Sequence, residues 1–291
     1  MAEHYYLYAL TAAGASPQGL GAGVDPRFDV ELMPVGRVAG VASRVGLDQF
    51  DTNKLEAGTT DLAWLGKVAV RHNAVIDTLA GVFGVLPLRL GTLFDSRFSL
   101  IRRLTQFEAV AADFLERLGD RQEWAVKVYS QDGRADRPPA PGDCPNSPGT
   151  TGAAWSAKME PGTPCMPSRV QAGGTSQDSG TQYLAARRFE GERRQQARAF
   201  MEQELAALEG QLPPAADSWC RLRPLPTTLT GCENKMVWNG AFLVSRTGWP
   251  AFAEACADLH RRLYPKRLLL DVTGPWPPYH FCPSLEQRKS A

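Results

Sequence analysis

The side chains best suited to chemistry lie far apart in this 291-residue sequence. The four histidines, His4, His72, His260 and His280, are each isolated in the sequence, and none belongs to a recognised metal-ligand motif. The six cysteines include no CxxC pair, which favours reduced cytosolic thiols over structural zinc. The sequence also contains no GxSxG, HExxH, phosphate-binding loop or kinase motif. We therefore predict no catalytic residue, no cofactor-binding residue and no metal site.

Two charged residues close to one apolar run are candidate structural or partner-contact residues. Arg89 interrupts the run Val85–Leu90, which has the pattern of a strand covered on both faces. An unpaired buried charge is very costly, so we expect Arg89 to reach water or a carboxylate such as Asp95 or Asp271. A structural ion pair of Asp271 with Arg89 or Arg246 is the preferred interpretation.

The positions of Asp95 and His72 each allow a catalytic role and a structural one. Asp95 follows a strand end and precedes a helix, where an acid can be catalytic. A helix also needs an acceptor there, and we expect Asp95 or Ser96 to cap it. His72 lies on the apolar stripe of the preceding helix, which indicates a core histidine hydrogen-bonded to the backbone rather than an acid or base.

The elements that must position these residues indicate an α+β fold. Period-two alternation predicts a strand at Trp124–Tyr129. The segment from Thr181 onward then reads as helix, strand, strand, helix and strand, the order of a ferredoxin-like (split βαβ) unit. In this segment we expect a long helix over Gln182–Leu212 and a last strand at Leu268–Thr273. In the first region we expect further strands at Tyr5–Leu10, Phe28–Met33 and Arg37–Val45, with two amphipathic helices around the Val85–Leu90 run.

The region from Ser130 to Gly180 differs in composition from the rest of the chain. Proline, glycine, serine and threonine dominate it and aliphatic residues are nearly absent, so it cannot bury enough surface to offset the entropy of ordering. We predict a disordered insertion at 130–180 between an N-terminal α+β domain at 1–129 and a C-terminal ferredoxin-like domain at 181–291.

Charge and hydropathy argue against several classes of partner. The net charge of +1 gives no electrostatic reason to expect nucleic acid or an anionic membrane, and no apolar run is long enough to span a bilayer. The arginines of the long helix are interleaved with glutamates, which is typical of ion pairs on a solvated face. The first residues lack the pattern of a signal peptide, so a cytoplasmic location is expected.

Three aromatic residues near the end of the chain are further candidate structural or partner-contact residues. Trp276, Tyr279 and Phe281 stand among Pro275, Pro277 and Pro278. Prolines at this density restrict the backbone and hold the rings in place at low entropic cost. The rings either pack onto their own domain or anchor another protein. We expect packing for Trp276 and partial exposure for Tyr279 and Phe281.

Four stretches together resemble the gas vesicle protein F/L family. The longest is LGKVAVRHNAVIDTLAGVFGVLPLRLGTLFDS at 65–96. WAVKVY at 124–129 and GPWPPYHF at 274–281 are similar to a strand and the ending of that family, and YYLYA at 5–9 is similar to its first strand. The resemblance spans the chain in the order of the family but omits the middle, where the insertion is longer than usual.

The resemblance implies a non-enzymatic accessory or minor structural protein of the gas vesicle, the gas-filled buoyancy organelle of some prokaryotes. It further implies that the small shell protein and other gas vesicle proteins are partners, and that the chain is needed for vesicle formation. The alternative is a small-molecule-binding module or enzyme on a ferredoxin-like scaffold. A deep pocket with convergent polar groups would favour that alternative, and an exposed apolar patch would favour the assembly role.

Overall fold

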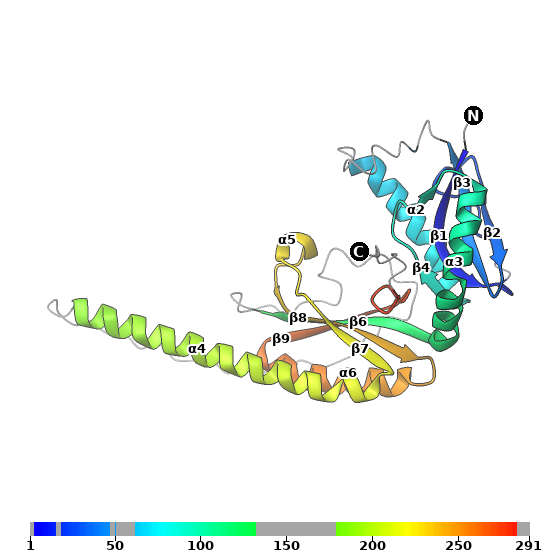
Figure 1. Cartoon of the computed structure of the whole chain (residues 1–291). Helices are drawn as coiled ribbons and strands as arrows, with labels where there is room; N and C mark the ends of the chain where they lie inside the picture. Colours follow the sequence, from blue (N-terminus) through cyan, green and yellow to red (C-terminus); the bar gives the residue numbers. More distant parts are fainter. Residues whose placement is uncertain (1–2, 16–18, 47–49, 51–61, 132–178, 284–291) are drawn as a thin grey trace, which may run out of the picture.

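The computed structural model describes residues 3–15, 19–46, 50, 62–131 and 179–283. It contains two antiparallel β-sheets, each covered by helices (Figure 1). This mixed helix and sheet content confirms the α+β class at that level of detail. The predicted insertion lies almost wholly outside the described residues. Within the described residues, no helix combines the length and the apolar character that crossing a membrane would require.

The first sheet is built around its N-terminal strand. Its path runs β2-β3-β1-β4, and the short strand β5 pairs with β1 beyond β4. All these pairs are antiparallel. The strands are β1 (Glu3–Ala12), β2 (Val30–Val35), β3 (Val38–Gly46), β4 (Val85–Pro87) and β5 (Leu93–Phe94).

Helices α2 (Leu62–Ala80) and α3 (Arg97–Leu118) cover opposite faces of this sheet (Figure 1). Successive residues of a strand point to opposite faces, so β1 contributes to two cores. A register irregularity between Leu7 and Ala9 lets Leu7 and Leu10, which are three positions apart, share one of these cores. Leu7 and Leu10 pack with the apolar stripe of α3. Tyr6 and Tyr8 pack with the stripe of α2, whose buried members include Val68, Val75, Ile76 and Leu79. The three-to-four spacing visible in the sequence therefore corresponds to the inward face of each helix.

The second sheet is built from strands that are distant in sequence. Its order is β7-β8-β6-β9 and all neighbours are antiparallel. Strand β6 therefore lies between two strands that come more than a hundred residues later in the chain. The strands are β6 (Arg121–Ser130), β7 (Ser218–Leu222), β8 (Lys235–Ser245) and β9 (Leu268–Trp276).

One face of the second sheet is covered by two helices, α4 (Ser179–Gln211) and α6 (Trp249–Leu263). Leu208 near the end of α4 and Leu212 just after it are fully buried in the core of this sheet together with Trp238 and Phe242 of β8. The rest of α4 extends well past the sheet (Figure 1). A short helix, α5 (Thr227–Thr230), lies in the connection between β7 and β8.

Among the strand boundaries that differ from those expected, two concern the candidate residues. The apolar run that was expected as one strand, Val85–Leu90, is regular only over Val85–Pro87 and resumes pairing at Leu93. The last strand does not stop at Thr273 but continues through Trp276, which pairs with Glu123 of β6. Prolines are tolerated there because β9 is an edge strand, whose outward N–H groups have no ladder partner to lose.

Candidate interaction surface

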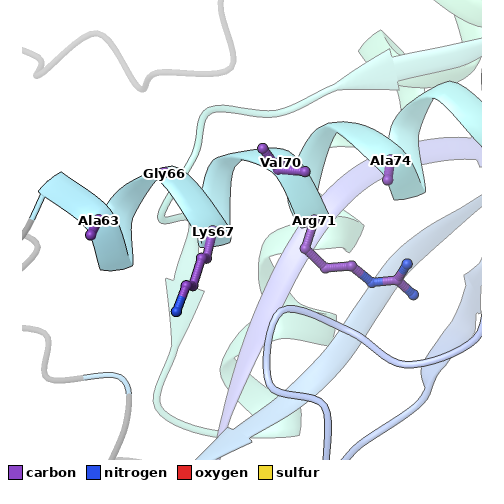
Figure 2. Close-up of a pocket in the computed structure, with 6 residues that line it drawn as sticks. All are labelled: Ala63, Gly66, Lys67, Val70, Arg71 and Ala74. Carbon is purple, nitrogen blue, oxygen red and sulfur yellow. The ribbon is translucent and has the colours of Figure 1, made fainter. Parts of the chain in front are cut away.

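Helix α2 has a buried side and an outward side that also carries apolar residues. The outward residues Ala63, Gly66, Val70 and Ala74 recur every three or four positions and form one stripe along the helix (Figure 2). Val70 is 72% exposed. A surface helix ordinarily presents polar residues to water, so an apolar outer stripe indicates an interaction surface.

This stripe lines a shallow open groove of about 550 Å³, whose described lining is almost wholly apolar. Lys67 and Arg71 border it (Figure 2). The guanidinium of Arg71 is engaged elsewhere, because it donates hydrogen bonds to the backbone carbonyls of Leu20 (2.9 Å) and Ala22. The groove is thus an apolar strip rather than a pocket with convergent polar groups. A small-molecule site would need such groups to orient a ligand.

The buried side of α2 contains His72, whose ring is held by groups on both sides. The Tyr6 hydroxyl lies 3.0 Å from its Nδ1, and that hydroxyl also accepts a hydrogen bond from the Gly91 backbone N–H (3.0 Å). Burial lowers the pKa of His72, and a hydrogen bond to the Leu88 backbone acts against that shift. This is a core histidine, as the apolar stripe predicted, and its lowered pKa favours the neutral form of the ring.

A second feature lies where the two sheets meet. There, the segment after β9 contacts both of them. Tyr279, which is 41% exposed, donates through its hydroxyl to Asn73 Oδ1 of α2 at 3.4 Å. Phe281 and Cys282 pack against the core on the α3 side of the first sheet, and Leu243 of β8 belongs to that same core. Trp276 is half-buried and its Nε1 donates to Thr273 Oγ1 at 3.3 Å. The three aromatic candidates therefore share a segment but lie in different surroundings.

The expectation for Arg89 is wrong in its premise. The residue comes after the end of β4 and is exposed, so it is not a buried charge in mid-strand.

Asp271 is also placed differently from the expectation. It stands opposite Lys127 of β6, and burial raises the pKa of its carboxyl while the nearby Lys127 lowers it. Arg246, the other arginine expected near Asp271, donates instead to the Gly81 carbonyl at 3.3 Å.

The structure decides between the two expected caps of the helix α3. Ser96 is the N-cap residue, and its side chain accepts from the Ser99 backbone N–H at 3.2 Å. The Ser99 hydroxyl oxygen in turn accepts a hydrogen bond from the Ser96 backbone N–H, which completes a capping box. Asp95 supports this box by accepting a hydrogen bond from Ser99 Oγ. These hydrogen bonds lower the pKa of Asp95. Asp95 therefore stabilises a helix start.

Sequence reasoning missed Glu123, the most deeply buried acid of the junction. Its side chain accepts from the His280 backbone N–H and contacts the His280 ring, 157 residues later in the chain. The strand expected from the sequence began at Trp124, so Glu123 lay outside it, and nothing local marked its partner. Among the described residues, no group of three or more histidine, cysteine, aspartate or glutamate side chains has the arrangement of a metal site.

Comparison with known proteins identifies the class of protein to which this geometry belongs. The family model described as "Gas vesicle synthesis protein GvpL/GvpF" matches residues 4–283, and the chain belongs to that family of gas vesicle proteins. Gas vesicle protein L of Streptomyces sp. (strain CB03234) is 30% identical over 289 residues, covering 97% of this chain and 94% of the relative.

Two crystal structures share the fold. GvpF from Anabaena sp. PCC7120 superposes with a TM-score of 0.60 at 16% identity, covering 97% of both chains. GvpF from Microcystis aeruginosa gives 0.57 at 14% identity, covering 96% of this chain and 98% of the other. The resemblance first seen in four short stretches is thus confirmed over nearly the whole length. The role of the chain is one related to gas vesicles, and its family is not an enzyme family.

Proposed function

We propose that this chain is an accessory or minor structural protein of the gas vesicle that binds the small shell protein and is needed for vesicle formation. The observation that carries this proposal is the family match over residues 4–283. We further propose that it acts in the cytoplasm and at the vesicle, with the shell protein and other gas vesicle proteins as partners, and that it catalyses no reaction.

A physical rationale supports an assembly role. A shell subunit must present an apolar surface to the gas, and that surface is an aggregation hazard before the subunit is incorporated. A partner that covers or orients such a surface favours ordered growth of the shell over aggregation of its subunits. Among the residues that the structure describes, we choose the outward stripe of α2, with Val70 at its centre, as the surface for that contact.

The proposed division of the chain follows the sheets. We propose two units, with the C-terminal one a split βαβ unit of the ferredoxin-like kind. The strand order β7-β8-β6-β9 and the helices between β6 and β7 and between β8 and β9 support this. The expected boundary at residue 129 would assign β6 to the first unit, whereas β6 pairs with β8 and β9. The boundary therefore belongs near Gly119, where α3 ends.

Co-purification with the shell protein tests the function and the surface together. Gly66→Leu places a branched side chain in the groove, and its Cβ is accommodated because no atom lies within 4 Å of that position. Leucine is also a better helix former than glycine, so melting should be unchanged or slightly higher. We expect recovery of shell protein to fall about tenfold or more, as for the loss of an interface hot spot.

Val70→Glu should weaken recovery by a similar factor, because it places a charge in the centre of the stripe. Val110→Glu is the matched control, since Val110 is an exposed valine (46%) on α3, the helix on the opposite face of the first sheet. Failure of the unmodified chain to recover any shell protein would contradict the proposed function. Equal recovery with Gly66→Leu, Val70→Glu and Val110→Glu would leave the function standing and remove α2 as the contact.

A further inference from the structure

The segment Pro277–Cys282, called the strap below, crosses the junction of the two sheets at the end of β9 (Figure 1). Its contacts reach three different elements. Tyr279 meets Asn73 of α2, and His280 meets Glu123 of β6. Phe281 packs with the α3-side core of the first sheet. Such a short segment makes few contacts of its own, so its position depends strongly on each of them.

One of these contacts is an ion pair with a deeply buried acid. Glu123 is 2% exposed. One of its oxygens accepts from the His280 backbone N–H at 2.9 Å, and the other lies 2.6 Å from His280 Nδ1. A buried carboxylate without a counter-charge is expensive, and charge-assisted hydrogen bonds are about twice as strong as neutral ones. The protonated imidazole is therefore the form that best compensates Glu123.

We propose that the strap is a pH-sensitive lock between the two sheets, closed by protonated His280 on Glu123 and loosened when that proton is lost. The side chain of His280 is 44% exposed, so protons and hydroxide reach it without unfolding of the chain. Loosening would withdraw Phe281 from the core that it shares with Leu243 of β8. The device would thus couple solution pH to how firmly the second sheet is held against the first.

Among the ionisable groups that the strap contacts or faces, His280 is the one whose ordinary pKa of 6.5 lies nearest neutral pH. Its hydrogen bond and ion pair with Glu123 raise the pKa of His280 above 6.5. Burial raises the pKa of Cys282 to about 12 and also raises those of Tyr279 and of Cys220 on β7. Burial likewise raises the pKa of Asp77 of α2, which lies near Tyr279. The stabilisation from His280 is complete below pH 6.5 and is lost as pH rises through its raised pKa.

Hydrogen exchange of the full chain measures the lock directly, because the His280 N–H itself donates to Glu123. The readout is the protection of a peptide covering residues 277–283 at pH 5.5 and 8.5, each corrected for the intrinsic exchange rate at that pH. We expect protection to fall at least about threefold at the higher pH, since each pKa unit corresponds to a tenfold change in equilibrium. A peptide covering β3 should keep its protection and serves as the internal control.

Two variants separate the lock from general stability. In His280→Gln the ring is lost at a partly exposed position, and protection of the strap should become independent of pH. In Glu123→Gln protection should be low at both pH values. The proposal is overturned if the wild-type strap is equally protected at both pH values. It is also overturned if His280→Gln retains the same fall in protection.

Discussion

At the scale of single residues, the two histidines of the core and junction respond to pH in opposite directions. Burial lowers the pKa of His72, so the folded state disfavours its charged form. The unfolded chain takes up the proton near pH 6.5, and stability is therefore complete above that value and falls as pH drops below it. For His280 the folded pKa is raised and stability falls as pH rises. The contribution of these two groups to the free energy of unfolding should thus be greatest near pH 6.5.

His72→Gln should remove the loss of stability on the acid side. We expect the urea midpoint of the wild type to fall between pH 7.5 and pH 5.5, because protonating His72 opposes its burial beside Tyr6. The variant should show a smaller fall over the same interval, although it is less stable at pH 7.5. His280→Gln is the control, and it should keep the acid-side fall. An equal fall in all three proteins would show that other groups control acid sensitivity.

Whether a residue was predictable depended on whether its signal was local. His72 could be assigned to the core because its stripe repeats every three to four positions within one helix. Glu123 could not be paired with His280, because the two are brought together by the path of β9 and the strap rather than by spacing. The prediction that Arg89 lies in mid-strand was wrong because the apolar run continues past Pro87, whereas strand β4 ends there.

At the scale of elements, α3 depends on a cap made of three short side chains. Ser96→Ala removes the acceptor for the Ser99 backbone N–H and should destabilise the protein by about 1 kcal/mol. Thr105→Ala, on the exposed side of the same helix, should change stability by less than about 0.5 kcal/mol. Thermal or chemical unfolding of both variants measures the difference. Equal destabilisation by the two substitutions would mean that the capping hydroxyl contributes no more to stability than an exposed hydroxyl elsewhere on the helix.

Helices were better predicted than strand ends, for a physical reason. A helix of several turns repeats its apolar signal many times, as α3 and α6 do, so an error of one residue hardly matters. A strand end is set by its partners. Strand β9 runs on through Gly274 and Pro275 because β6 remains alongside as far as Glu123. Proline and glycine suggested a break, but an edge strand accommodates both.

At the scale of the whole molecule, β6 holds the C-terminal strands to the N-terminal part of the chain. The composition of residues 130–180 predicts that limited proteolysis cuts there first. Because β6 lies between β8 and β9, the two fragments should not separate after the cut. We expect two bands on a denaturing gel and one peak on size exclusion at the elution volume of the intact chain.

Two peaks in that experiment would show that the pairing of β6 is too weak to hold the fragments. First cleavage inside a helix such as α6 would instead contradict the predicted insertion. The elution profile is informative because β6 comes before the predicted cut, while its partners β8 and β9 come after it.

The place of β6 also has a consequence for biosynthesis. On the ribosome this strand is complete about 100 residues before its partner β8 begins, a wait of roughly 5–20 s at usual rates of translation. Throughout that interval both edges of β6 lack their native partners, while the first sheet already has all of its strands. An unpaired strand of this kind can associate with another nascent chain. Misassembly between neighbouring nascent chains on one polysome is therefore a risk during that interval.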